Sequence, residues 1–156
     1  MMFVEKYQSY PDHPDRFDVY QQLLCREVLT GRCYWEVQWS EWVSVSVSYR
    51  RISRRGDSDD CRFGGNDHSW SLDCYPGEYH VLHNKRPTST TSSSPCPDSG
   101  RVAVYVDVPA GTLSFYEVVS DRLIHLHTFN TSFSEPVSAG FGFWFSPGSS
   151  VSLCPV

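Results

Sequence analysis

The run LTGRCYWEVQW at residues 29–39 constrains the fold of this chain more than any other segment. A Thr-Gly turn precedes a stretch in which large aromatic residues recur at alternate positions. Because successive side chains of a strand point to opposite faces, Trp35, Val37 and Trp39 share one face and Glu36 shares the other with Gln38. A large aromatic side chain buries about 150–250 Å². Two indoles on one face therefore predict a half-buried strand in an antiparallel sheet.

The same alternation recurs along the rest of the chain. Valine alternates with serine over residues 43–49, and residues 102–107 and 113–118 flank a Pro-Ala-Gly turn that is typical of a hairpin. Residues 16–26 are a weak helix candidate, and the Ser/Thr-rich residues 85–98 are predicted to form a loop. Short strands at regular spacing indicate an all-β sandwich or barrel. The further predicted strands are residues 69–75, 78–84, 123–128 and 137–145.

Composition and charge narrow the function classes. With 156 residues, 40% of them hydrophobic, the chain is predicted to be one folded domain. The net charge is −5 and the pI about 5.6, whereas nucleic-acid binders are usually basic, so no nucleic-acid partner is predicted. The arginines of residues 50–55 are followed by several aspartates, which favours a solvated strand end over a phosphate-binding patch. No apolar run approaches the roughly 18 residues of a membrane span, so none is predicted.

Six cysteines leave two interpretations open. Reduced thiols in a cytoplasmic protein are favoured, and a secreted protein with disulfides and a glycan on Asn130 is the alternative. His125 and His127 stand two apart on a predicted strand and are expected to share a face, but no third metal ligand accompanies them. Residues 57–60 lack the glycine and glutamate of a calcium loop. We therefore predict no metal and no cofactor.

Several segments, in order, resemble the PRY–SPRY domain family. Residues 10–17 are among the matching segments. Their sequence is similar to that of the fish domains attached to tripartite-motif proteins, NOD-like receptors and pore-forming toxins. The resemblance covers roughly residues 8 to 154, so it is specific. The segments that carry it are residues 29–37, 47–49, 52–56, 69–72, 101–107, 110–116, 145–148 and 151–154.

The resemblance implies a bent, concanavalin-like sandwich of two antiparallel sheets. It also implies a single PRY–SPRY domain over residues 1–156, with a partial PRY segment at 1–28 that lacks its first strand and an SPRY core at 29–156. An unpaired edge left by that missing strand would favour self-association. In the family the domain itself is not catalytic, and ubiquitin transfer belongs to a separate RING domain.

The resemblance also predicts where a protein partner binds. The positions used by the antibody-binding member of the family fall near Ser44, Asp73, Tyr75 and Ser149. None keeps that member's acidic, Trp, Trp or Phe residue, so that particular ligand is not expected. Tyr75 is interpreted either as an interface anchor or as a residue that packs the loop at Pro76-Gly77.

Two further groups complete the predicted binding surface. Trp42 is interpreted either as an exposed contact residue or as one folded over the sheet edge. The charged residues Asp12, His13 and Arg16 either contribute to the same surface or form a solvated loop. The predicted partner-binding residues are Asp12, His13, Arg16, Trp42, Ser44, Asp73, Tyr75 and Ser149.

The sequence thus favours a non-enzymatic protein-recognition domain, the specificity module of a larger innate-immune or ubiquitin-ligase protein in the cytoplasm. The alternative is the C-terminal domain of a secreted pore-forming toxin subunit, or a lectin-like sandwich that binds glycan or lipid. A sandwich glycosidase would need two facing carboxylates. Glu36 and Glu117 are the only acids inside strong strand patterns, and nothing brings them together.

Overall fold

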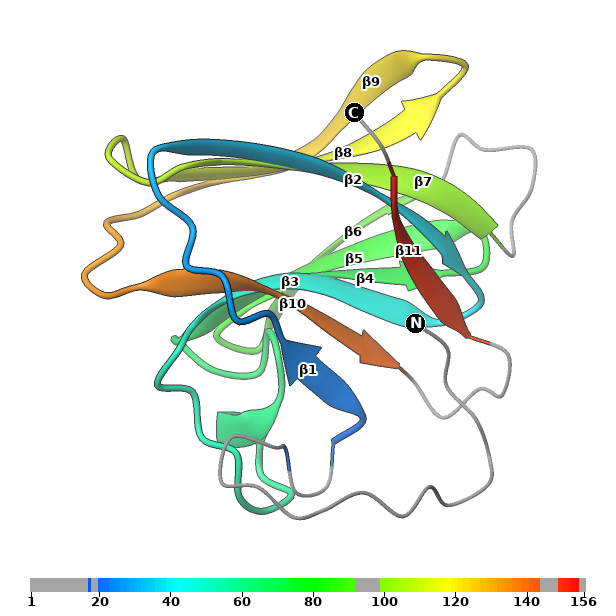
Figure 1. The fold of residues 1–156 in the computed structure, drawn as a ribbon. Helices are drawn as coiled ribbons and strands as arrows, with labels where there is room; N and C mark the ends of the chain where they lie inside the picture. The colour runs from blue at the N-terminus through cyan, green and yellow to red at the C-terminus, as the bar shows by residue number, and fades with distance from the viewer. Residues whose placement is uncertain (1–16, 18–19, 92–98, 144–148, 155–156) are drawn as a thin grey trace.

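The predicted two-sheet antiparallel β-sandwich is confirmed in the computed structural model, which describes residues 17, 20–91, 99–143 and 149–154 (Figure 1). One sheet has the strand order β1 (Gln22–Leu24), β10 (Val137–Phe143), β3 (Val43–Tyr49), β4 (Ser69–Tyr75), β5 (Glu78–His83), β6 (Arg86–Thr91). The other has the order β11 (Ser150–Cys154), β2 (Arg32–Ser40), β7 (Ser99–Asp107), β8 (Thr112–Val119), β9 (Arg122–Asn130). A 3-10 helix, η1 (Asp59–Cys61), lies between β3 and β4.

The main core lies between the two sheets and follows the alternation of β2 and β3. Val37 and Trp39 of β2 are buried, and Trp35 packs against the core while half-buried. Val43, Val45 and Val47 of β3 are fully buried on the facing sheet. The Thr-Gly turn before β2 is confirmed by Gly31, whose φ of +64° is a left-handed conformation that glycine adopts without strain.

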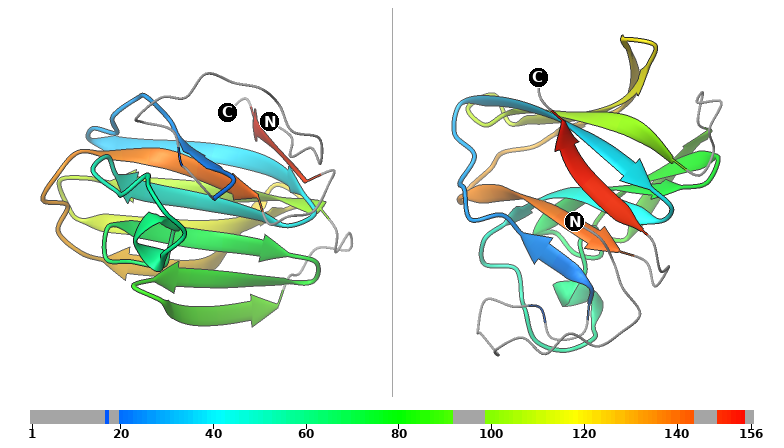
Figure 2. Two further views of the ribbon diagram at one scale, coloured as in Figure 1. Left: turned by 90° about the horizontal axis from the view of Figure 1, so that it is seen from below. Right: turned by 45° about the vertical axis from the view of Figure 1, so that its right-hand side comes forward.

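A second, smaller core covers the outer face of the six-stranded sheet. Residues 50–68, which connect β3 to β4 and include η1, lie over that face (Figure 2, left). Phe17, Ile52 and Phe63 are buried there, with Leu24 packed against them. Gly140 of β10 makes room for the Phe63 ring, because a Cβ at Gly140 would lie only 2.7 Å from it. This cover decides which outward side chains of β3 and β4 reach solvent.

Two segments differ from the sequence prediction. Residues 86–91 form the edge strand β6 rather than a loop; its threonines suit a strand, and Pro87 is tolerated at an edge that has no further partner strand among the described residues. The helix considered for residues 16–26 does not form at Gln22–Leu24, which pairs with β10 as strand β1. Pairing with an existing strand outweighs the weak local helix propensity.

Among the described residues, no helix has the length and apolar character needed to cross a membrane.

Candidate functional site

The candidate site lies on the outer face of the six-stranded sheet, where the polar positions of β3 and β4 meet. Because the valines of β3 face the core, its serines face outward. The strand register places Ser44 opposite Asp73 and Ser46 opposite Ser71. One strand further, Asp73 is opposite His80 of β5, so these side chains form one row across three strands.

The centre of this row is a buried hydrogen-bond network around Asp73, which has no exposed surface. The Ser44 and Ser71 hydroxyls donate to Asp73 Oδ1 over 3.0 and 2.8 Å, and the Ser46 hydroxyl donates to Ser71 over 3.0 Å. Asp73 Oδ2 lies 4.0 Å from the Arg62 guanidinium and accepts no hydrogen bond from the described residues. The network therefore satisfies one carboxylate oxygen fully and the other through charge alone.

Burial raises the pKa of the Asp73 carboxyl above its ordinary value. Hydrogen bonds from Ser71 and Ser44, followed by the positive charge of Arg62, oppose that shift by stabilising the charged form.

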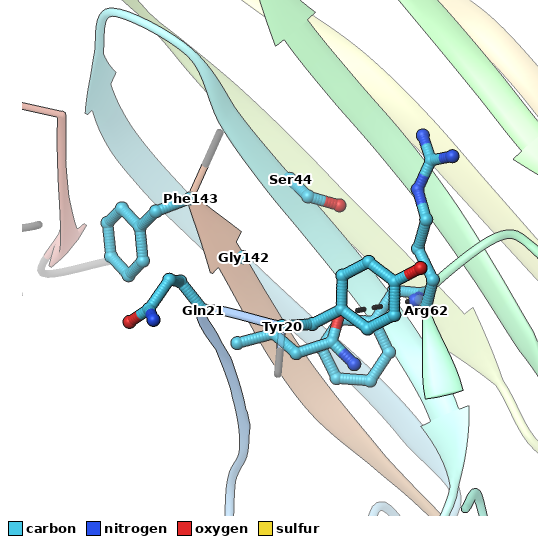
Figure 3. A pocket seen from close by; sticks show the side chains of 8 residues that line it. Tyr20, Gln21, Ser44, Arg62, Gly142 and Phe143 are labelled. Atoms are coloured by element: carbon cyan, nitrogen blue, oxygen red, sulfur yellow. Dashed lines mark hydrogen bonds between the residues drawn. The ribbon is translucent and has the colours of Figure 1, made fainter. Parts of the chain in front are cut away.

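A small cavity of about 20 Å³ opens beside the network (Figure 3). That volume is close to the space needed by one water molecule, so the cavity is too small for a cofactor. Gln22 fixes one wall, because its side chain donates to the Cys61 carbonyl and accepts from the Phe63 amide. The lining residues are Tyr20, Gln21, Gln22, Ser44, Arg62, Phe63, Gly142 and Phe143.

At the end of the same strands, three aromatic side chains form a cluster that we name the aromatic rim: Trp42, Tyr75 and His80. The rings of Trp42 and Tyr75 meet edge to face with centroids 5.0 Å apart, and Tyr75 and His80 lie 4.8 Å apart. Trp42 is 44% exposed, whereas Tyr75 and His80 are half-buried. Glu78, opposite Tyr75 in the register, approaches His80 Nε2 to 3.1 Å.

Local turns hold the rim in place. Trp42 follows Glu41, whose φ of +61° reverses the chain between β2 and β3. Gly77, with φ of +83°, reverses it between β4 and β5 and brings Glu78 back beside Tyr75. Burial and the nearby Asp73 charge raise the pKa of Tyr75 to about 12, so the phenol is a protonated hydrogen-bond donor at neutral pH.

The structure separates the predicted binding residues into two groups. Trp42 and Tyr75 are in contact at the surface, whereas Ser44 and Asp73 lie buried beneath the covering segment. Ser149 is also buried, and its hydroxyl has no hydrogen-bond partner among the described residues. The remaining predicted residues, Asp12, His13 and Arg16, lie outside the part of the chain that the structure describes.

Two residues of the site were not found from the sequence. His80 joins the rim because of the β4–β5 register, and the alternation of β5 together with the Pro-Gly turn carried that signal. Arg62 belongs to residues 50–68, and no motif or hydrophobic period in that segment predicts where it packs on the sheet.

The expected shared face of His125 and His127 is wrong. A register shift between Phe115 and Tyr116 leaves His127 opposite Phe115 and His125 opposite Tyr116, on opposite faces of the sheet. The bulge inserts one extra residue and so breaks the two-residue period. No group of three or more potential metal ligands occurs within the described residues.

The structure also shows where the two carboxylates of the glycosidase alternative and most of the cysteines lie. Glu117 is buried on the face that includes Val37 and Val102, and Glu36 points to the other face of the same sheet, so the two carboxylates do not face one another. Five cysteines lie in the described residues and all five are free thiols: Cys25, Cys33, Cys61, Cys74 and Cys154.

The comparison with protein families decides the relationship. The model of the SPRY domain matches residues 32–154, which is most of the chain. This chain belongs to the SPRY domain family. The resemblance drawn from the sequence is thereby confirmed, and domains of this family are in general non-catalytic modules for protein binding.

Relatives of this SPRY domain include fish toxin subunits and tripartite-motif proteins. Neoverrucotoxin subunit alpha of Synanceia verrucosa is 44% identical over 146 residues, which cover 92% of this chain and 20% of the toxin subunit. Tripartite motif-containing protein 14 of Mus musculus is 36% identical over 143 residues, which cover 88% of this chain and 31% of that protein. The solved TRIM65 PSpry domain matches with a TM-score of 0.82 and 25% identity, covering 98% of this chain and 77% of that one.

The SPRY domain described here thus spans about a fifth of the length of the toxin subunits that it matches.

Proposed function

We propose that this SPRY domain is a non-catalytic recognition module that binds a protein partner through the aromatic rim. The observation that carries the proposal is Trp42, a large apolar side chain that is 44% exposed and braced edge to face by Tyr75. Exposed aromatic residues of this kind supply most of the free energy at many protein interfaces. Tyr adds a rigid apolar body with a polar tip, which suits recognition at small entropic cost.

The rigid sheet beneath the rim supports the proposal. Ser44, Ser71 and Asp73 tie β3 to β4 through side-chain hydrogen bonds in addition to the backbone ladder. A surface whose geometry is already set loses little conformational entropy when it binds. Ser44 and Asp73 accordingly support the contact residues from below, as buried Ser149 is also proposed to do, and Asp12, His13 and Arg16 stay proposed contributors to the surface.

The role in a larger protein is a proposal at a coarser level. The match to a tripartite motif-containing protein favours a specificity module of an innate-immune or ubiquitin-ligase protein, with a cytoplasmic location as predicted from the sequence. The second candidate is a domain of a toxin subunit. Its support is the 44% identity to neoverrucotoxin subunit alpha, which is higher than the 36% identity to the tripartite motif-containing protein. Self-association through a sheet edge is a third proposal, and β6 is one edge of the six-stranded sheet.

Proximity labelling with the wild-type domain, followed by affinity measurement with the purified partner, tests the proposal. Trp42→Ala and Tyr75→Ala are each expected to weaken the partner by about 1–3 kcal/mol, which is about 5- to 150-fold in Kd. Leu123→Ala is the matched control, because Leu123 is 50% exposed on β9 of the other sheet. Unchanged affinity in both rim variants, or an equal loss in the control, would overturn the assignment.

A further inference from the structure

Acidic groups lie beside and beneath the aromatic rim. Glu78 is exposed and stands opposite Tyr75, and Glu41 directly precedes Trp42. Asp73 lies beneath, and the Arg62 guanidinium lies 4.0 Å from Asp73 Oδ2. Within the described residues Glu78 approaches His80, which is a cation only when protonated. The rim therefore presents ring surface beside negative charge, in a chain with a net charge of −5.

These two features select one kind of side chain. A cation above the face of an aromatic ring is attracted by the ring quadrupole, and Trp is the best partner for it. An acidic side chain would be repelled by Glu78, and an apolar one would cover that carboxylate without a compensating hydrogen bond. Arginine satisfies both groups, because its flat guanidinium stacks on an aromatic ring while its N–H groups donate to a carboxylate.

We infer that the aromatic rim binds an arginine side chain of the protein partner, stacked on Trp42 and paired with Glu78. This inference rests on the proposed function and names the chemistry of the partner. Residues directly opposite on antiparallel strands have Cβ atoms roughly 4.5–5.5 Å apart. Tyr75 and Glu78 are such a pair, and the Tyr75 ring also contacts the Trp42 ring at 5.0 Å between centroids, so Tyr75 connects the ring cluster to the carboxylate.

The molecule already packs arginine against aromatic rings in this way. The Arg54 guanidinium lies 5.2 Å from the centroid of the Phe17 ring, and that of Arg51 lies 5.9 Å from the Tyr49 ring while it also pairs with Glu135. Arg51 thus combines a ring and a carboxylate, the same two contacts that the rim offers to an incoming arginine.

The test is an NMR titration of the domain with capped tripeptides in which the central residue is Arg, Lys, Glu or Leu between two glycines. The reporters are the indole N–H of Trp42 and the backbone N–H of Gly77, which lies between the paired Tyr75 and Glu78. The Arg peptide is expected to shift both signals in a saturable way and to bind more tightly than the Lys peptide. The Glu and Leu peptides are expected to give no saturable shift.

Charge-matched variants decide the origin of any binding. Glu78→Gln is expected to weaken the Arg peptide about two- to fivefold, as an exposed ion pair would, and Trp42→Ala to abolish the saturable shift. Asp121→Asn removes an exposed acid on the β8–β9 turn of the other sheet and is expected to leave the titration unchanged. Equal effects of the two acidic variants would mean general attraction of cations, and would overturn the inference.

Failure of this inference and failure of the proposed function give different results. If the partner is lost with Trp42→Ala but bound normally by Glu78→Gln, and the Glu and Leu peptides bind as well as Arg, the rim recognises a different chemistry. If Trp42→Ala leaves the partner unaffected, the rim is not the recognition surface, whatever the peptides do.

Discussion

The outer face of strands β3 and β4 has two different parts, one buried and one that reaches solvent. Along the strands, Ser44, Ser71 and Asp73 are buried beside residues 50–68 and are hydrogen-bonded to one another. At their ends, Trp42 is exposed and Tyr75 is half-buried. Both stretches have the outward positions of the alternating pattern, so alternation alone does not distinguish them. The difference comes from the cover, and the site is the part of the face that the cover leaves open.

The largest expected effect on stability comes from truncating Phe63, which packs residues 50–68 against the sheet. Phe63→Ala is expected to lower the free energy of unfolding by about 3–5 kcal/mol, because it deletes a buried ring that fills the space above Gly140. Urea denaturation followed by far-UV circular dichroism measures the change. A loss below about 1 kcal/mol would mean that the packing of residues 50–68 on the sheet contributes little to stability. The buried network and the aromatic rim would then not differ in their contribution to the fold.

A smaller loss of stability is expected when the space that the Phe63 ring occupies above Gly140 is filled by a side chain at residue 140. Gly140→Val places a Cβ where the Phe63 ring now lies, and overpacking of this kind costs about 1–3 kcal/mol. Because both substitutions act on one contact, the double variant is expected to lose less than the sum of the single losses. Strict additivity in the double-mutant cycle would contradict the packing of Phe63 on Gly140.

Buried Asp73 is expected to make the stability of the domain depend on pH in the opposite direction to an ordinary paired carboxylate. Because burial raises the pKa of the folded Asp73 carboxyl, the folded state holds this proton more tightly than the unfolded chain, whose pKa is about 3.9. Below that value both states are protonated and Asp73 contributes no dependence. As pH rises from about 4 towards the raised folded pKa, the unfolded chain ionises first and stability falls.

Asp73→Asn is expected to remove this contribution while keeping an acceptor for Ser44 and Ser71. The free energy of unfolding of the wild type minus that of Asp73→Asn should therefore fall as pH rises above about 4. Denaturant midpoints across this range measure it, with Asp121→Asn correcting for the loss of one charge. A difference that rises with pH would mean that the hydrogen bonds and Arg62 outweigh burial.

The sequence was sufficient where one local rule governs the structure. The period of two in β2 and β3 predicted the inward valines and the buried Trp39, and the Thr-Gly pair predicted the turn, at which Gly31 is left-handed. It failed where a single residue or a distant contact changes the outcome. The bulge opposite Phe115 and Tyr116 reversed one of two histidines, because one extra residue reverses every later side chain.

The candidate site shows the same limit. Trp42 and Tyr75 were found from residue chemistry and the resemblance, whereas their contact depends on two turns and a register that only the folded sheet shows. Ser44 and Asp73 were predicted as partner-binding residues, but both are buried, and the structure brings Arg62 of the distant segment 50–68 to within 4.0 Å of Asp73. Long-range packing of this kind leaves no period in the sequence to read.

The smallest expected effect is the one that separates the two halves most sharply. Trp42→Ala removes an exposed ring from the rim, so the free energy of unfolding is expected to change by less than about 0.5 kcal/mol, as for most surface substitutions. The same urea experiment used for Phe63→Ala measures it. A loss of several kcal/mol would instead make Trp42 a structural residue like Phe63, and a weakened partner would then report damage to the fold. Near-neutral stability combined with lost binding would place the partner's contact at the open end of β3 and β4, because no change in the sealed half would then be needed to explain it.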